Sequence, residues 1–185
     1  MSRAIGKRFD PLPLIAENVP SALQRMDRFV VWRAFTSGKP DGKADKIPVD
    51  ILTGKKVSAF DPLHQMSFAD ALEAYEAGAG DGVVVVLDGH PIGTADDGAP
   101  LYLVGVDLDN VFDSDASQQT ALKIVDDLRS YAELSPSGRG LRIFCISRHK
   151  PRSGQTKFGE LYAEKRFLTI TGNQINFGSL AEATD

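Results

Sequence analysis

Two aspartates stand one residue apart at the end of an apolar run, in the segment Val104-Gly-Val-Asp-Leu-Asp-Asn110. Residues i and i+2 of a strand share one face, so Asp107 and Asp109 are expected to project together. Neighbouring carboxylates repel each other unless a hard cation such as Mg²⁺ or Mn²⁺ lies between them or one is protonated. The pair therefore predicts a divalent-cation site. An ordinary acidic turn is the alternative, because Asp113 and Asp115 follow.

A second candidate segment is Ser135-Pro-Ser-Gly-Arg-Gly-Leu-Arg142. Its glycines permit positive φ and a close backbone approach, and its serine and arginines supply hydrogen-bond donors. The residues concerned are Ser137, Gly138, Arg139, Gly140 and Arg142. This combination is typical of a cradle for phosphate oxygens. A plain hairpin turn with solubilising arginines is the alternative.

The third candidate is the segment from Gly159 to Gly172, in which Glu160 and Tyr162 alternate with an apolar residue. Glu160 therefore shares a strand face with Tyr162 and could reach a cation held by the two aspartates. A tight turn at Glu164-Lys165 predicts a hairpin here. An exposed hairpin face carrying Glu and Lys is the alternative to a ligand.

Taken in this order, the three segments resemble the three motifs of the archaeo-eukaryotic primase superfamily, especially the primase-polymerases of phages and plasmids. The resemblance covers about residues 28–172 and implies that Asp107, Asp109 and Glu160 bind two divalent metals, Mg²⁺ or Mn²⁺. It implies that the incoming nucleotide's triphosphate is bound by Ser137, Gly138, Arg139, Gly140, Arg142 and Arg166. The family usually has His where this chain has Arg142. A guanidinium binds phosphate but stays protonated, so it cannot transfer protons.

The resemblance also implies a reaction and its partners. The reaction is template-directed nucleotidyl transfer from nucleoside triphosphates on a single-stranded or primed DNA template in plasmid or phage replication. A helicase is expected as a partner, either joined to the same chain or separate. The chain itself is expected to be the N-terminal fragment of a longer protein.

Charge is segregated along the chain although the formal net charge is only -4. Residues 81–115 contain eight acids and no Lys or Arg, and residues 139–166 contain eight bases against two acids. This order suits a cation site beside a phosphate site. The basic residues expected to follow a template strand are Arg148, Lys150, Arg152 and Lys157. A solvated loop is the alternative for each of them.

Hydrophobic patterning predicts an α+β fold. The predicted strands are 29–35, 47–51, 83–87, 101–109, 141–146, 159–163 and 167–171, and the predicted helices are 67–77 and 117–132. Residues 36–46 are predicted to form a surface loop, and strands 83–87 and 101–109 are predicted to pair. The last four strands, near Val104, Ile143, Leu161 and Leu168, are expected to form one antiparallel, RNA-recognition-like (ferredoxin-like) sheet with helices on one face. A smaller N-terminal α/β lobe would flank this sheet.

The length of 185 residues fits a single catalytic domain, with approximate lobes at 1–100 and 101–175. One cysteine, Cys145, cannot form an intramolecular disulfide, and the longest apolar run, Val83 to Leu87, is far shorter than a bilayer. We therefore expect a cytoplasmic location and no membrane partner.

Two other functions fit parts of the pattern. A phosphatase of the haloacid-dehalogenase type also carries Asp-x-Asp after a strand, but it would continue as a βαβ unit with a later Lys and a second acidic pair. A non-catalytic nucleic-acid-binding domain of a replication initiator would keep the fold while Arg142 marks lost chemistry. Metal-dependent incorporation of a labelled nucleotide separates these alternatives from the polymerase.

Overall fold

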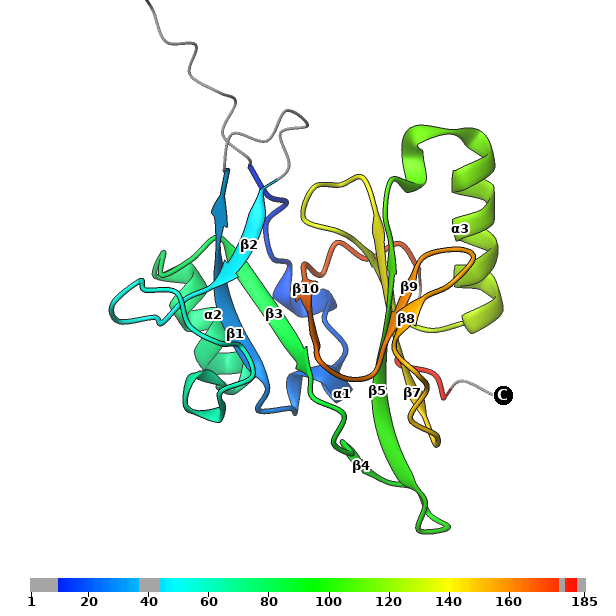
Figure 1. Cartoon of the computed structure of the whole chain (residues 1–185), viewed down its shortest axis with the longest axis horizontal. Helices are drawn as coiled ribbons and strands as arrows, with labels where there is room; N and C mark the ends of the chain where they lie inside the picture. The colour runs from blue at the N-terminus through cyan, green and yellow to red at the C-terminus, as the bar shows by residue number, and fades with distance from the viewer. Residues whose placement is uncertain (1–9, 37–43, 177–178, 183–185) are drawn as a thin grey trace, which may run out of the picture.

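Two antiparallel sheets lie side by side in the computed structural model of the protein (Figure 1). The structure describes residues 10–36, 44–176 and 179–182. The first sheet has the order β10-β3-β1-β2. Its strands are β10 (Arg166–Ile170), β3 (Gly82–Leu87), β1 (Phe29–Phe35) and β2 (Asp45–Pro48). The second has the order β6-β7-β5-β9-β8, with β4 also pairing with β5. Its strands are β6 (Ala132–Leu134), β7 (Leu141–Ser147), β5 (Pro100–Leu108), β9 (Glu160–Tyr162), β8 (Gly154–Gln155) and β4 (Gly93–Thr94).

Each sheet has its own long helix, which confirms the α+β class. Helix α2 (Phe68–Glu76) packs on the first sheet and α3 (Asp115–Leu128) on the second, and the two lie on opposite sides of the molecule in Figure 1. The short helices are α1 (Ser21–Gln24), η1 (Ala16–Asn18), η2 (Pro62–His64) and η3 (Val111–Asp113). Most of the predicted loop at 36–46 lies outside the described residues.

Both long helices begin where a side chain caps them. The Ser67 hydroxyl accepts from the backbone N–H of Asp70 at 3.1 Å and donates to its carboxylate at 2.6 Å, so Ser67 caps the helix predicted at 67–77. Helix α3 starts two residues earlier than predicted, because Ser114 caps it. It also ends earlier, because Arg129 has a left-handed φ of 47°, and the chain then enters β6.

Two predicted strand pairings are wrong. Strands β3 and β5 belong to different sheets, since β3 pairs with β1 and β10 whereas β5 pairs with β7 and β9. All six residues of β3 are buried, so this strand needs a neighbour on both edges and cover on both faces. Local alternation predicts a strand but does not select its partner, and the loop from β3 to β5 is long enough to cross between sheets.

Strands β9 and β10 also do not form a hairpin. Lys165, with φ 55°, turns the chain out of the second sheet and into the first, so the strand containing Leu168 pairs with β3. The predicted sheet of four strands is therefore correct only for those of Val104, Ile143 and Leu161. As a consequence, β10 brings its inward-facing residues against the second sheet.

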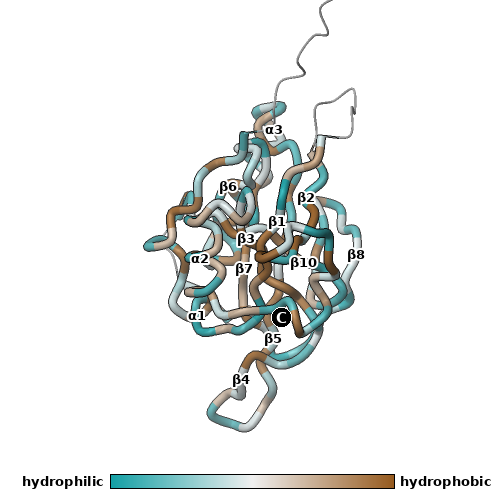
Figure 2. The backbone as a smooth tube through the Cα atoms, turned by 90° about the vertical axis from the view of Figure 1, so that its left-hand side faces the viewer, coloured by the Kyte–Doolittle hydropathy of each residue, from teal (hydrophilic) through white to brown (hydrophobic). Residues whose placement is uncertain are grey.

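The core lies between the two sheets and beneath the helices. Leu87 and Leu168 of the first sheet pack over Gly105 of the second, where an added Cβ would come within 2.3 Å of a Leu168 methyl carbon. The absent side chain lets the sheets approach closely. Figure 2 shows hydrophobic residues concentrated in these central strands and hydrophilic residues on the outer loops.

Replacing Gly140 with Ala should lower the free energy of unfolding by about 1–3 kcal/mol, because the new Cβ would lie 2.5 Å from the Leu108 carbonyl oxygen at the end of β5. Urea denaturation measures the change. Gly93→Ala is the matched control, since a Cβ there meets no atom within 4 Å, and it should alter stability by less than about 0.5 kcal/mol. Equal stability of the two variants would contradict the close approach.

Candidate active site

A row of charged residues crosses the second sheet, one from each of four neighbouring strands. Its members, in order across the sheet, are Glu133 of β6, Arg142 of β7, Asp107 of β5 and Glu160 of β9. Register partners share a face and lie about 5 Å apart. Asp107 shares its face with Gly105, which meets Leu168 of the first sheet. The row therefore faces the space between the sheets.

Asp107 and Arg142 form a buried ion pair at the centre of this row. Their side chains are only 8% and 7% exposed. Burial raises the pKa of the Asp107 carboxyl, the Arg142 charge opposes that shift, and the charges of Asp109 and Glu160 add to it. The Arg142 guanidinium also donates to the Leu141 carbonyl at 3.1 Å. The pair neutralises a carboxylate that would otherwise be costly to bury.

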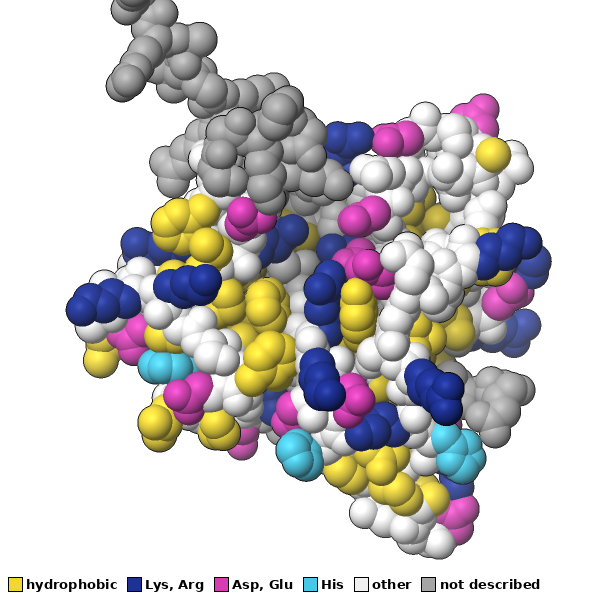
Figure 3. Space-filling view, in the orientation of Figure 1, with side chains coloured by type: hydrophobic (Ala, Val, Ile, Leu, Met, Phe, Trp, Pro, Cys, Tyr) yellow, Lys and Arg dark blue, Asp and Glu magenta, His cyan; other side chains and the backbone are white. Residues whose placement is uncertain are grey.

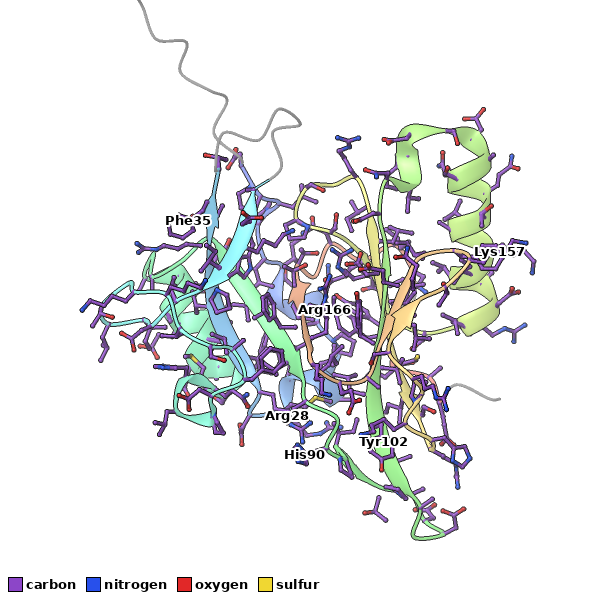
Figure 4. The ribbon with its side chains drawn as sticks, viewed as in Figure 1. Arg28, Phe35, His90, Tyr102, Lys157 and Arg166 are labelled. Carbon is purple, nitrogen blue, oxygen red and sulfur yellow. The ribbon has the colours of Figure 1, made fainter. Side chains whose placement is uncertain are left out.

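Glu160 is paired with an arginine from the opposite sheet. Arg166, the first residue of β10, donates to the Glu160 carboxylate at 3.3 Å and lies 4.6 Å from the centre of the Tyr162 ring. Figure 4 shows Arg166 between the two sheets, and Figure 3 shows acidic and basic side chains gathered along the same central region. Arg166 therefore reaches the Asp-x-Asp strand through Glu160, which is the register partner of Asp107.

Asp109 lies just outside the row, exposed beyond the last residue of β5. Asn110, with φ 54°, turns the chain away immediately afterwards. The segment 135–140 packs here as the turn between β6 and β7, with an added Cβ on Gly140 only 3.5 Å from the Asp109 Cα. The first two sequence segments therefore meet at one end of the sheet.

Side chains of that turn make mostly local contacts. The Ser137 and Ser135 hydroxyls are 3.2 Å apart, and the Arg139 guanidinium donates to the Asp113 carboxylate at 3.0 Å. Gly138 adopts φ 69°, as the sequence predicted for a glycine in this turn. Exposed Ser137 and Arg139 can therefore exchange these contacts for those of a ligand.

The acidic residues suit a hard divalent cation by donor type, because carboxylate oxygens are the ligands that Mg²⁺ and Mn²⁺ prefer. The buried Asp107 Oδ1 contacts Arg142 but makes no well-formed hydrogen bond, so it retains acceptor capacity. Within residues 10–36, 44–176 and 179–182, no three acidic, histidine or cysteine side chains are close enough together to hold a metal. Asp107 and Glu160 are instead paired with arginines.

An open cavity of about 360 Å³ adjoins Asp109 on the side of the sheet that carries α3. Its lining includes Asp109, Ser117, Thr120, Lys157 and Phe158. The Phe158 side chain is exposed, and the Lys157 ammonium lies 5.3 Å from the centre of its ring. Figure 4 shows Lys157 beside α3. An exposed aromatic ring next to a cation is a surface on which a nucleic-acid base can stack.

The other predicted template-binding residues lie elsewhere. Arg148 forms ion pairs with Asp97 and Glu182, and the Lys150 ammonium lies 2.8 Å from the Glu164 carboxylate. Both residues follow the end of β7 that pairs with Tyr102, which is the opposite end from Asp107. Exposed Arg152 follows in the same loop. The structure therefore does not bring Arg148 or Lys150 next to the carboxylates.

Glu133 is the member of the row that the sequence analysis missed. Its carboxylate is fully buried and accepts from the Tyr131 hydroxyl at 2.6 Å and from the backbone N–H groups of Thr171 and Gly172 at 2.9 and 2.8 Å. Burial raises its pKa to about 7, although these donors and the Arg142 charge oppose the shift. An acid in the alternating segment Tyr131-Ala-Glu-Leu134 was the available signal.

Glu133→Gln should change how stability depends on pH. The carboxyl has its pKa near 4.5 when unfolded and about 7 when folded, so the folded state retains a proton that the unfolded chain releases. The contribution of this group to the free energy of unfolding therefore falls, by on the order of 3 kcal/mol, between about pH 4.5 and pH 8. Relative to wild type, the variant should become more stable across that range in urea denaturation.

Glu76→Gln, an equivalent change at an exposed position of α2, is the control and should keep the wild-type pH dependence. An unchanged pH dependence in Glu133→Gln would contradict the raised pKa.

Comparison with known proteins gives one informative relative. No family model matches the chain. It is 29% identical over 159 residues to a protein named DNA primase-polymerase from Nitratiruptor phage NrS-1, a match that covers 82% of this chain and 20% of that protein. The chain thus spans about a fifth of the relative's length. In the described ranges, no helix has the length and apolar character needed to cross a membrane. The similarity supports a primase-polymerase relationship.

Proposed function

We propose that this chain is the catalytic domain of a DNA primase-polymerase, which joins nucleoside triphosphates on a single-stranded or primed DNA template. The observation that carries the proposal is the row of charged residues, in which Asp107 lies in register between Arg142 and Glu160 while Arg166 reaches the row from the opposite sheet. Similarity to a phage DNA primase-polymerase supports it independently.

In this function Asp107, Asp109 and Glu160 hold Mg²⁺ or Mn²⁺. Bound cations of this kind activate an attacking hydroxyl and neutralise charge on the phosphate under attack. Asp107 is fixed by burial between two strands, whereas exposed Asp109 is free to adjust at the strand end. Glu160 completes the set from the neighbouring strand, in register with Asp107.

Arg142 and Arg166 bind the triphosphate of the incoming nucleotide. Each is a permanently charged fork that matches phosphate oxygens, and each now neutralises one acidic residue of the site. Cations on the carboxylates would free these arginines for phosphate. Donors from Ser137, Gly138, Arg139 and Gly140 lie in the adjoining turn and extend the same cradle.

Lys157 and Phe158 are suited to contact the DNA template at the cavity beside Asp109. Arg148, Lys150 and Arg152 extend this role to the backbone of a longer strand. The ion pairs of Arg148 and Lys150 with acidic residues lie at the surface and contribute little free energy, so DNA phosphates can replace them. A helicase, in the same chain or separate, would supply the unwound template.

The alternatives fit the observations less well. A haloacid-dehalogenase-type phosphatase would continue from Asp-x-Asp into a βαβ unit, whereas β7 and β9 are both antiparallel to β5. A non-catalytic DNA-binding domain would not require three acidic residues at one sheet end. Incorporation assays decide between a binding domain and a polymerase.

Asp107→Asn and Asp109→Asn should each reduce Mn²⁺-dependent incorporation of a labelled nucleotide on a primed template by at least about a hundredfold, because each variant removes a charged metal ligand. Circular dichroism should report an intact fold. Asp126→Asn, an exposed residue of α3, is the control with the same charge change and should retain activity. Wild-type incorporation by the two site variants would end the polymerase interpretation.

Arg142→Ala should mainly weaken nucleotide affinity, by about 1.5–3 kcal/mol, because one charged hydrogen-bonding contact is lost. Steady-state kinetics would register this loss as a raised KM. Arg142→His should retain measurable incorporation, since a phosphate-binding role does not require proton transfer. Normal nucleotide affinity in Arg142→Ala would exclude the triphosphate role.

A further inference from the structure

We propose that Glu133 is a positioning residue of this site, which holds Arg142 in place beside Asp107 and fixes β10 against the second sheet. Glu133 does not touch the cation or nucleotide in this proposal and acts through the residues it orients. Its effect on nucleotide binding rests on the proposed function, whereas its effect on Arg142 does not.

Glu133 lies next to Arg142 in the row of charged residues. It is the register partner of Arg142 on the side away from Asp107, so the guanidinium lies between two acidic strands. Register partners on one face are about 5 Å apart, and the Arg142 charge acts on the Glu133 carboxyl. The guanidinium forms its ion pair with Asp107, and the Glu133 charge attracts it from the other side, so removing that charge changes the field in which Arg142 is held.

Glu133 also connects the second sheet to the first. Its carboxylate accepts from the backbone N–H groups of Thr171 and Gly172, which directly follow β10. At the other end of β10, Arg166 donates to Glu160. The two outer acids of one row therefore hold both ends of the same strand of the opposite sheet, and this strand carries Arg166.

The negative charge of Glu133 is costly to bury. A fully buried carboxylate loses hydration, and a neutral glutamine amide would accept from the same backbone N–H groups at less cost. The charged and titratable groups that face Glu133 are Tyr131, which immediately precedes β6, and Arg142 on the next strand; Thr171 and Gly172 contribute backbone donors. The hydroxyl and N–H donors also favour the charged form, but a glutamine oxygen can still accept from them; among these groups Arg142 alone carries an opposite charge.

Glu133→Gln tests the proposal because it keeps the shape and the hydrogen-bond acceptor while removing the charge. NMR of arginine side chains measures exchange of the buried Arg142 guanidinium protons, and it needs no activity. We expect this exchange to become about tenfold faster, in keeping with a weakened charged hydrogen-bonding contact. Glu76→Gln is the matched control and should leave the exchange unchanged.

Steady-state incorporation provides a second readout. KM for the nucleoside triphosphate should rise about tenfold with kcat within about twofold of wild type, because orientation for binding is lost while the cation ligands remain. The free energy of unfolding of the variant at pH 8 should not fall. A merely structural residue would instead lose stability with no selective effect on KM.

Three results overturn the inference. The first is wild-type exchange at Arg142 in folded Glu133→Gln, and the second is an unchanged KM. The third is a fall in the free energy of unfolding of Glu133→Gln that accompanies the changes in exchange and KM. If Glu133→Gln fails to fold, Glu133→Asp replaces it, since it retains the charge but withdraws it by one methylene. Wild-type exchange in Glu133→Asp would then overturn the inference. If the wild-type chain incorporates no nucleotide, the proposed function fails, and Arg142 exchange still decides the positioning role.

Discussion

Charge inside the space between the two sheets is the constraint on which the rest of this structure depends. A buried carboxylate or guanidinium is costly unless opposite charges and hydrogen bonds compensate for lost hydration. Here Arg142 lies between Asp107 and Glu133 in strand register. Arg166 of the opposite sheet neutralises Glu160. The compensation spans five strands, so the charged row can exist only when both sheets are assembled.

The apolar end of the same space brings those strands together. Leu87 and Leu168 pack over Gly105, two residues before Asp107 on the same strand. The backbone approaches of Gly140 and Gly159 to the end of β5 are equally close, with an added Cβ on Gly159 lying 2.6 Å from the Asp107 carbonyl oxygen. Tight apolar packing at one end therefore sets the spacing at which the charged residues meet at the other.

Stability and chemistry come from different ends of the interface between the two sheets. Val85, Leu87, Leu103 and Leu168 contribute buried apolar surface, which is the main source of folding free energy. The carboxylates and arginines carry opposite charges, which neutralise one another in pairs. A ligand that combines cations with phosphates offers each side chain a new partner of the right sign, so the pairs can open without leaving a buried charge unmatched.

Much of the local structure was determined by the sequence itself. The helix beginning at Ser67, the strand at 29–35 and the turn glycine at 138 follow from short-range rules. The order of the three polar segments indicated the residues of the candidate site. Asp107 and Arg142 were both identified, but nothing in their spacing predicts that they pair. Strand register decided that contact.

Only the tertiary structure decided which strands are neighbours. The patterns of β3 and β5 are equally strand-like, yet they enter different sheets because each is covered by different distant segments. The same is true of β9 and β10, so Arg166 reaches Glu160 across the interface between the sheets. Glu133 was missed for this reason: an acid in a short strand becomes informative only when the fold buries it beside Arg142, where its charge must be compensated.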